Sequence, residues 1–265
     1  MLRPDMTHSA LTLQQGCALR PGGSCANCTS HHRPTPRMGD VATPNEALAT
    51  SALLDAFATE QLRELALHSR LASFGREEVL WLNGAAAPFF GLVVEGYVKL
   101  VKTNGEHEST LEIMGPGQTF GLLGAITGAG CPLMAVGLSD GRFLRIPKTV
   151  FLEQYGKSQP MQARLAEQTA RRMHQKLDYM AKLANGSAEE RVAAILLELL
   201  DAYSDAEMRF IEIPLTRQQL AEMTGTRTET VIRVLSRWTK EGLIRTANRR
   251  ITVLKPNAVK AILSA

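Results

Sequence analysis

The sequence predicts an α+β protein with three parts: a double-stranded β-helix (jelly roll), a long helix and a C-terminal winged helix-turn-helix. Three observations support this. Short β-prone runs alternate with glycines between about residues 73 and 147, heptad spacing occurs between about 160 and 184, and two capped helical segments lie between 216 and 245. The expected divisions are a cysteine-containing segment at 1–45, the roll at 46–158, the long helix at 159–185 and the winged domain at 186–265.

Length and composition indicate a globular protein. The chain has 265 residues, of which 45% are hydrophobic, and this leaves room for two domains. No apolar run reaches the roughly 18 residues of a membrane helix, and the N-terminus lacks a basic-then-apolar signal pattern. We expect a cytoplasmic protein without a membrane partner. Because cytoplasmic thiols are kept reduced, its four cysteines are expected to be ligands, sensors or fillers rather than disulfides.

Most of the cysteines lie in the first 45 residues, which are rich in Gly, Pro, Ser, Thr and His and show no sustained periodicity. The candidate ligands are Cys17, Cys25, Cys28, His31 and His32, with Cys131 far downstream. A Cys-x-x-Cys pair brings two thiolates to one metal. The spacing leaves several possibilities open: zinc, an iron–sulfur cluster, a regulatory disulfide, or a tail with incidental cysteines.

The roll is predicted from evenly spaced strands. Apolar residues at helical intervals suggest one or two helices over 46–72, and the runs VLWL, FFGLVV, YVKLV, TLEIM and RFLRI follow. Glycines punctuate these runs, and Asn104-Gly105 is a strong hairpin signal. Short strands with glycine turns favour a small barrel or double-sheet roll.

The long helix carries a heptad seam. The positions that step by three and four residues are Ala166, Thr169, Met173, Lys176, Met180 and Leu183. The rest of the helix is largely polar, so the seam is expected to face a second copy and form a homodimer. Lys176 would then face its own copy. One hypothesis is that this repulsion keeps the dimer weak and open to regulation, and the alternative is that Lys176 bends to solvent.

The winged domain contains two short helices joined by a tight turn. Thr216 and Gln219 have capping-box spacing, Gly225 supplies the turn, and Thr226 with Glu229 repeats the spacing at a second helix over about 227–240. LIRT and RRITVL, separated by ANRR, are expected to form a hairpin wing. This arrangement is a winged helix-turn-helix.

The second helix of such a motif presents its N-terminal half to base edges in the major groove. The residues so placed are Thr228, Glu229, Ile232 and Arg233, and Arg237, one turn further on, is another expected DNA contact. Arginine donates two hydrogen bonds to guanine, and glutamate accepts one from cytosine. The alternative is that Glu229 only caps its helix and pairs with Arg233, as many i,i+4 neighbours do.

Charge supports the DNA interpretation. From Arg217 to the end the chain has ten Lys or Arg and three Glu, whereas the whole chain has a net charge of only +4. Positive charge concentrated in one domain is typical of phosphate-backbone binding, with double-stranded DNA as the partner. The expected phosphate contacts are Arg217, Arg237, Lys240, Arg245, Arg249 and Arg250.

These features together resemble the cyclic-AMP receptor/fumarate–nitrate reduction regulator (CRP/FNR) family. The resemblance covers about residues 46–265 and is most specific in GPGQTFGLLGAI, FLRIPKTVF, AEERVA and TGTRTETVIRVLSRWTKEGLI. It implies a dimeric transcription factor rather than an enzyme, which acts on a palindromic operator with RNA polymerase as a partner. Glu229 and Arg233 match the family's base-reading glutamate and arginine.

Two further comparisons concern the effector. Members that bind cyclic nucleotides carry Phe-Gly-Glu and a later Arg-Ser or Arg-Thr, but this chain has Leu122 and Pro132-Leu133, so no cyclic AMP is expected. Members like the oxygen-responsive regulator hold a [4Fe–4S] cluster, which implies Cys17, Cys25, Cys28 and Cys131 as ligands here. Their fourth cysteine aligns with Leu144, and His31 or His32 is an alternative ligand, also for zinc or haem. Thiol oxidation or an unidentified ligand in the roll remains open.

Overall fold

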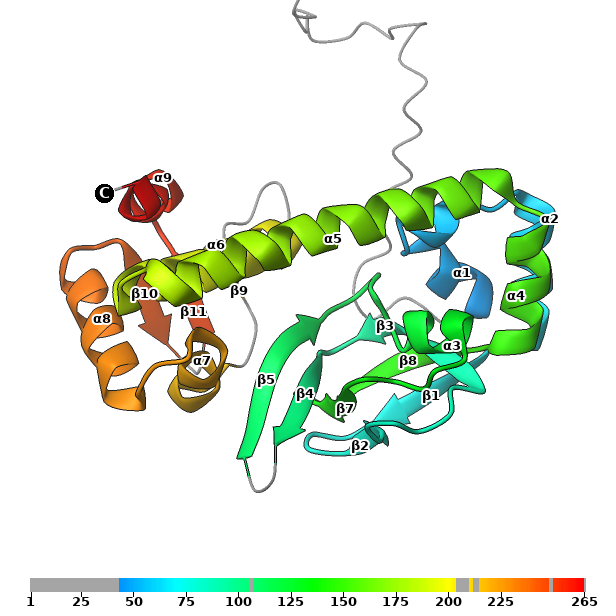
Figure 1. Cartoon of the computed structure of the whole chain (residues 1–265), viewed down its shortest axis with the longest axis horizontal. Helices are drawn as coiled ribbons and strands as arrows, with labels where there is room; N and C mark the ends of the chain where they lie inside the picture. The colour runs from blue at the N-terminus through cyan, green and yellow to red at the C-terminus, as the bar shows by residue number, and fades with distance from the viewer. Residues whose placement is uncertain (1–42, 105–106, 204–209, 212–214, 248–249, 265) are drawn as a thin grey trace, which may run out of the picture. The chain divides into compact units, whose positions relative to one another are not determined.

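The first elements of the computed structural model are short helices that precede the roll (Figure 1). The structure describes residues 43–104, 107–203, 210–211, 215–247 and 250–264. Helix α1 (Pro44–Ala49) begins with a capping box, because the Thr43 hydroxyl accepts from the Glu46 amide and the Glu46 carboxylate accepts from the Thr43 amide. Helix α2 (Thr59–His68) follows a 3-10 turn at Leu54–Ala56.

Two four-stranded antiparallel sheets form the roll, with the orders β1–β8–β3–β6 and β2–β7–β4–β5. The strands are β1 (Arg70–Phe74), β2 (Val79–Trp81), β3 (Phe89–Glu95), β4 (Val98–Asn104), β5 (His107–Met114), β6 (Thr119–Phe120), β7 (Met134–Gly137) and β8 (Gly141–Pro147). The first and last strands pair with each other, with Arg70 opposite Arg145 and Phe74 opposite Gly141. This pairing joins the start of the roll to its end.

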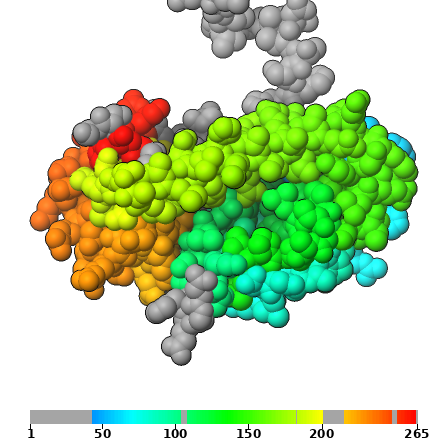
Figure 2. Space-filling model, viewed as in Figure 1, coloured from blue at the N-terminus to red at the C-terminus, as the bar shows by residue number. Residues whose placement is uncertain are grey.

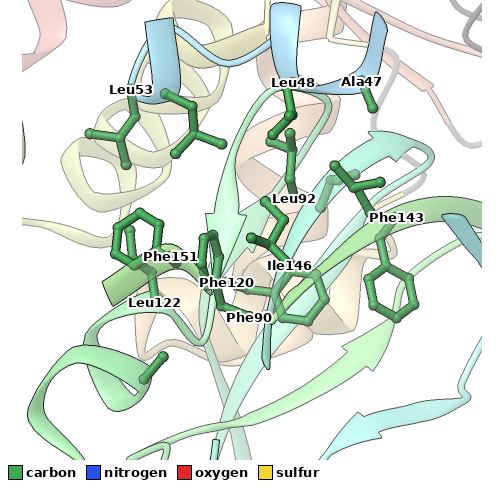
Figure 3. Close-up of a cluster of buried hydrophobic side chains, with 14 of the residues drawn as sticks. Ala47, Leu48, Leu53, Phe90, Leu92, Phe120, Leu122, Phe143, Ile146 and Phe151 are labelled. Carbon is green, nitrogen blue, oxygen red and sulfur yellow. The ribbon is translucent and has the colours of Figure 1, made fainter. Parts of the chain in front are cut away.

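The core of the roll lies between the sheets and the helices around them. Figure 3 shows side chains from α1 and from the strands converging on this core, among them Leu48, Phe90, Leu92, Phe120 and Ile146. Phe151, from α4 (Lys148–Gly156), packs edge-on against Phe57 and Phe90. Each such side chain contributes about 1.5 to 3 kcal/mol when fully buried. The aromatic contacts therefore fix α4 against the roll.

Two longer helices follow, α5 (Gln159–Asn185) and α6 (Ala188–Tyr203). The N-terminal end of α5 belongs to the roll core through Met161 and Leu165. A capping box opens α6, because the Glu190 carboxylate accepts from the Ser187 amide at 2.6 Å and the Ser187 hydroxyl accepts from the Glu190 amide at 3.2 Å. Only Gly186 and Ser187 separate the two helices.

The C-terminal part packs around a second buried cluster, which includes Val192, Leu196, Leu220, Val231 and Trp238 together with Ile113 and Leu138 of the roll. Its elements are β9 (Phe210–Ile211), α7 (Arg217–Thr224), α8 (Thr228–Lys240), β10 (Ile244–Ala247), β11 (Arg250–Val253) and α9 (Pro256–Ala261). Strands β10 and β11 pair antiparallel, and β11 also pairs with β9. The predicted hairpin wing is therefore present.

The sequence-based expectations for secondary structure agree with the fold at the long elements. The helix expected over about 160–184 is α5, the five expected strands are β2, β3, β4, β5 and β8, and Asn104 and His107 face each other at the end of the β4–β5 hairpin. The short strands β1, β6 and β7 were not predicted. Among the described residues, no helix is both long enough and apolar enough to cross a membrane.

Candidate nucleic-acid interface

Helix α7 begins and ends as the sequence predicts. The Gln219 amide donates to the Thr216 hydroxyl at 3.1 Å, and the Thr216 amide donates to the Gln219 carboxamide at 2.9 Å, which completes the capping box. Gly225 ends the helix with a φ of 58°, a left-handed conformation that residues with a Cβ adopt at a cost. The chain can thus turn sharply into α8.

The start of α8 differs from the prediction. The N-cap residue is Arg227, which forms no side-chain capping bond within the described residues, so the expected Thr226–Glu229 capping box is wrong. The Thr226 amide instead donates to the Ala221 carbonyl at 3.0 Å. This bond is part of a Schellman-type cap at the end of α7, and the Thr226 amide therefore cannot donate to the Glu229 carboxylate as a capping box requires.

Helix α8 has one buried face and one exposed face. Val231, Val234, Leu235 and Trp238 are buried against the C-terminal cluster. The predicted base-reading residues Glu229, Ile232 and Arg233 are exposed, and Thr228 is half-buried. In the described part of the chain, Glu229 and Arg233 form no ion pair with each other or with another side chain. Both charged groups are therefore left to meet an external partner.

Arg237 is held by its own chain. Its guanidinium pairs with the Glu189 carboxylate of α6 and lies 3.9 Å from Glu241. Glu189 also accepts a hydrogen bond of 2.7 Å from the Trp238 indole. One carboxylate thus joins the N-terminal turn of α6 to the C-terminal half of α8. Arg237 was predicted as a DNA contact, and the structure gives it a positioning role that the sequence analysis missed.

Glu189 should make stability depend on pH. Burial alone would raise the pKa of its carboxyl, but the hydrogen bonds from Arg237 and Trp238 lower that pKa below its ordinary value of 4.5. Because the folded-state pKa is depressed, the stabilisation is complete above pH 4.5 and is lost as the pH falls through the lowered value. We expect Glu189→Gln to weaken the fold at neutral pH and to flatten its pH dependence in acid.

Urea unfolding followed by tryptophan fluorescence, from neutral pH to well below 4.5, measures this effect. Glu60→Gln is the matched control, because Glu60 lies 83% exposed on α2. Parallel pH profiles for the wild type and Glu189→Gln would contradict the assigned role of Glu189.

The predicted phosphate contacts are only partly described. Arg217, Lys240 and Arg245 are exposed. Arg249 lies outside the described residues, and of Arg250 only the backbone is described, in β11. Arg227 is also exposed, at the N-cap of α8, and was not singled out from the sequence. Its place immediately before the recognition helix was the signal that could have identified it.

Comparison with known proteins identifies the family. Residues 71–158 match the model of the cyclic nucleotide-binding domain, and residues 190–262 match that of the Crp-like helix-turn-helix domain. The chain is also 30% identical, over 155 residues, to the cyclic AMP receptor protein of Thermus thermophilus, which covers 58% of this chain and 69% of that protein. The chain belongs to the CRP/FNR family.

Other members of the CRP/FNR family are similar over more of the chain. The nitrogen fixation regulation protein FixK of Bradyrhizobium diazoefficiens is 29% identical over 83% of this chain and 92% of its own length. The structure of FixK2 from Bradyrhizobium japonicum has a TM-score of 0.68 at 23% identity and covers 74% of this chain and 98% of that one. These matches confirm the predicted fold class. The chain is a DNA-binding transcription regulator, not an enzyme.

Helix α5, where this CRP/FNR chain was predicted to dimerise, runs along the surface of the molecule in the view of Figure 2, and it exposes a continuous row of apolar side chains. We call it the α5 stripe, and it consists of Ala163, Ala166, Ala170, Met173, Leu177, Met180 and Ala184. Met173, Leu177 and Met180 are 59%, 49% and 62% exposed. Successive members are three and four residues apart, which is the spacing of a coiled-coil seam.

The α5 stripe and the predicted seam share only some residues. Ala166, Met173 and Met180 belong to both, and Thr169 is exposed beside the stripe. Lys176 is half-buried, with its ammonium 3.5 Å from Glu198 and 3.8 Å from Glu112 of the same chain, and Leu183 is also half-buried. This position does not support repulsion between two Lys176 side chains across a seam.

Of the predicted metal ligands, only Cys131 lies within the described residues; Cys17, Cys25, Cys28, His31 and His32 lie outside them. Cys131 has a free thiol that is 4% exposed. Its sulfur is tightly enclosed, since a Cβ built on Gly124 would come within 3.1 Å of it. Burial raises the pKa of the thiol, and the neighbouring Trp81 opposes this increase.

A fourth cluster ligand must contact iron directly, and the enclosed sulfur of Cys131 leaves little room for iron in this structure. Among the described residues, no three His, Cys, Asp or Glu side chains are close enough together to hold a metal ion.

Proposed function

We propose that this CRP/FNR regulator acts as a homodimer on a palindromic operator and responds to oxygen or redox state through its N-terminal cysteines. The observation that carries the DNA-reading part is the exposure of Glu229, Ile232 and Arg233 on a helix whose opposite face is buried. Glutamate and arginine can read cytosine and guanine, so the half-site is expected to contain a G·C pair. RNA polymerase is the expected second protein partner.

The α5 stripe supports the homodimer. Large apolar side chains rarely form a long exposed row on a monomer, because covering them with a second copy removes apolar surface from water. A two-fold axis along α5 would pair two identical stripes and place two copies of α8 on the same side of the dimer. An operator read by such a dimer is an inverted repeat.

Selection of bound DNA from a random library tests the DNA-reading part. The expected product is an inverted repeat with half-sites about 34 Å apart, one turn of the double helix. Enrichment of single, unpaired half-sites would contradict dimeric reading, and no enrichment would contradict sequence-specific binding.

For sensing, the proposal is that Cys17, Cys25 and Cys28 bind an iron–sulfur cluster. Their number and spacing support it, and the enclosed thiol of Cys131 leaves His31 or His32 as the better fourth ligand. A bound cluster would supply oxygen-sensitive redox chemistry to the N-terminal segment. The alternatives are that the N-terminal segment binds zinc or haem instead of a cluster, or that its thiols are oxidised directly.

Anaerobic purification with iron, sulfide and zinc analysis distinguishes these forms. We expect about four iron and four sulfide per chain, with a visible absorption band that bleaches in air. Cys25→Ala should lose the iron, whereas Cys131→Ala should retain it. A colourless protein after reconstitution would exclude the cluster, and zinc in its place would assign the cysteines to a structural site.

A further inference from the structure

The roll contains a cavity of 310 Å³ beside α5. Its walls come from the strands, from α3 (Leu122–Thr127) with the loop that follows it, and from α5 between Leu165 and Lys176. Ligand cavities in proteins typically have volumes of about 300 to 1,000 Å³. This cavity is therefore large enough for a small organic molecule.

Most of the wall is apolar where a cyclic nucleotide would need charged partners. Leu122 lines the cavity at the position where nucleotide-binding members carry a glutamate. Leu133 also lines it, at the position where those members have the serine or threonine that follows their arginine. Leu122 is only 5% exposed. Burying a cyclic phosphate against these side chains would leave an anion without a partner, which costs several kcal/mol. The wall thus excludes an anionic ligand at this end.

The charged side chains at the opposite wall neutralise one another. Arg172 lies 2.6 Å from Glu112, and Lys176 lies 3.8 Å from Glu112 and 3.5 Å from Glu198. The charges of Arg172 and Lys176 are therefore balanced by those of Glu112 and Glu198. Of the described residues that line the cavity, Arg172 and Lys176 are the only basic ones, so no unpaired cation is left for an anionic ligand.

Two polar atoms at the cavity wall lack conventional partners. Trp81, 6% exposed, has no nitrogen or oxygen acceptor for its indole N–H within the described part of the chain, and only the Cys131 thiol, a weak acceptor, lies beside it. The side-chain oxygen of Gln168 is buried and has no donor among the described residues. Both residues line the cavity. Buried polar groups are normally hydrogen-bonded, so these two atoms point to a missing ligand.

We propose that this cavity binds an uncharged, largely apolar effector that carries one N–H or O–H donor for Gln168 and an acceptor for Trp81. The inference deepens the proposed function, because it treats the ligand as a signal to the same regulator. It names a ligand class different from the cyclic nucleotide after which the matching domain is named. The N-terminal cysteines and the cavity are separate inputs, and each is tested on its own.

N-phenyl-1-naphthylamine is a suitable probe because it is neutral, has two aromatic groups, carries one N–H donor and fluoresces more strongly in apolar surroundings. We expect saturable binding of about one probe per chain to the full-length protein, with energy transfer from tryptophan. Trp81→Phe should remove most of the transfer, since Trp81 lines the cavity and Trp238 belongs to the separate C-terminal cluster.

Two substitutions locate the probe. Leu133→Glu, at a half-buried position that tolerates a charge on folding, should weaken probe binding at least tenfold. Gln168→Leu keeps the volume but removes the acceptor, and should weaken binding about fivefold, the value of one hydrogen bond. Gln175→Leu is the matched control, because Gln175 lies two turns further along α5 and is exposed.

The possible outcomes separate this inference from the proposed function. Non-saturable binding, equal binding by Leu133→Glu and the wild type, or displacement of the probe by cyclic AMP would overturn the uncharged-ligand assignment. If the protein selects an operator but fails these tests, only the inference about the cavity is wrong. A protein that binds the probe but selects no DNA sequence contradicts the proposed function instead.

Discussion

Arg233→Ala is expected to abolish preference for the selected operator while leaving binding to unrelated DNA nearly unchanged. Arg233 is exposed on α8 and, within the described residues, has no carboxylate partner to lose. A bidentate arginine–guanine contact is worth about 1 to 3 kcal/mol, roughly a five- to hundredfold loss for each half-site. A dimer loses two such contacts, so the specific affinity should fall by roughly the square of that factor.

Fluorescence anisotropy with the selected operator and with a scrambled duplex, over a range of salt concentrations, measures the change. A base-reading residue changes the ratio of the two affinities, whereas a phosphate contact such as Arg245 weakens both and reduces the salt slope by about one. Arg63→Ala is the charge-matched control, because Arg63 is 66% exposed on α2. An unchanged affinity ratio for Arg233→Ala would refute its assignment as a base-reading residue.

Leu177→Glu is expected to convert the dimer into monomers. Leu177 is 49% exposed near the middle of the α5 stripe, and pairing two stripes would bury two unpaired carboxylates. Such burial costs several kcal/mol, so the dimer dissociation constant should rise by about two orders of magnitude or more. Sedimentation equilibrium measures the constant, and operator affinity should fall with it, because a monomer reads only one half-site.

Two other variants sharpen this test. Leu67→Glu introduces the same charge at a leucine that is 77% exposed on α2, and it should leave the dimer unchanged. Lys176→Leu distinguishes the two possible seams. If Lys176 faced its copy, the substitution would tighten the dimer, but its contacts with Glu112 and Glu198 predict no tightening. A dimer unaffected by Leu177→Glu would exclude the α5 stripe as the interface.

The sequence predicted the elements whose signals are local. Thr216 and Gln219 form the capping box that their spacing indicates, and Gly225 adopts the left-handed turn. The Thr226–Glu229 spacing has the same pattern but forms no box, because the backbone of Thr226 is already used to end α7. The spacing alone does not show whether Thr226 caps the end of α7 or the start of α8. Strand β6, only two residues long, depends on pairing with β3 and has no periodicity of its own.

The parts that could not be predicted depend on contacts between distant residues. Two heptad seams on α5 share Ala166, Met173 and Met180, and only the position of the roll shows that Leu177 rather than Lys176 faces outward. Arg237 has the charge of a phosphate contact, yet its partner Glu189 lies on α6, far earlier in the chain. The cavity likewise combines side chains from the strands and α5, which no local pattern relates.

Because Glu189 holds α8 near the break between α5 and α6, a rotation at that break displaces the far end of α8 more than the near end. Glu189 lies two residues after Ser187, at the break between α5 and α6, and holds Trp238 and Arg237 near that break. The base-reading end of α8, at Thr228, lies ten residues from Trp238, about 15 Å along the helix axis. A swing of about 15° at the break would therefore move that end by roughly 4 Å, close to the ~3.4 Å spacing of base pairs. The same swing moves Arg233, five residues from Trp238, by roughly 2 Å, which is enough to break hydrogen bonds between its guanidinium and a base.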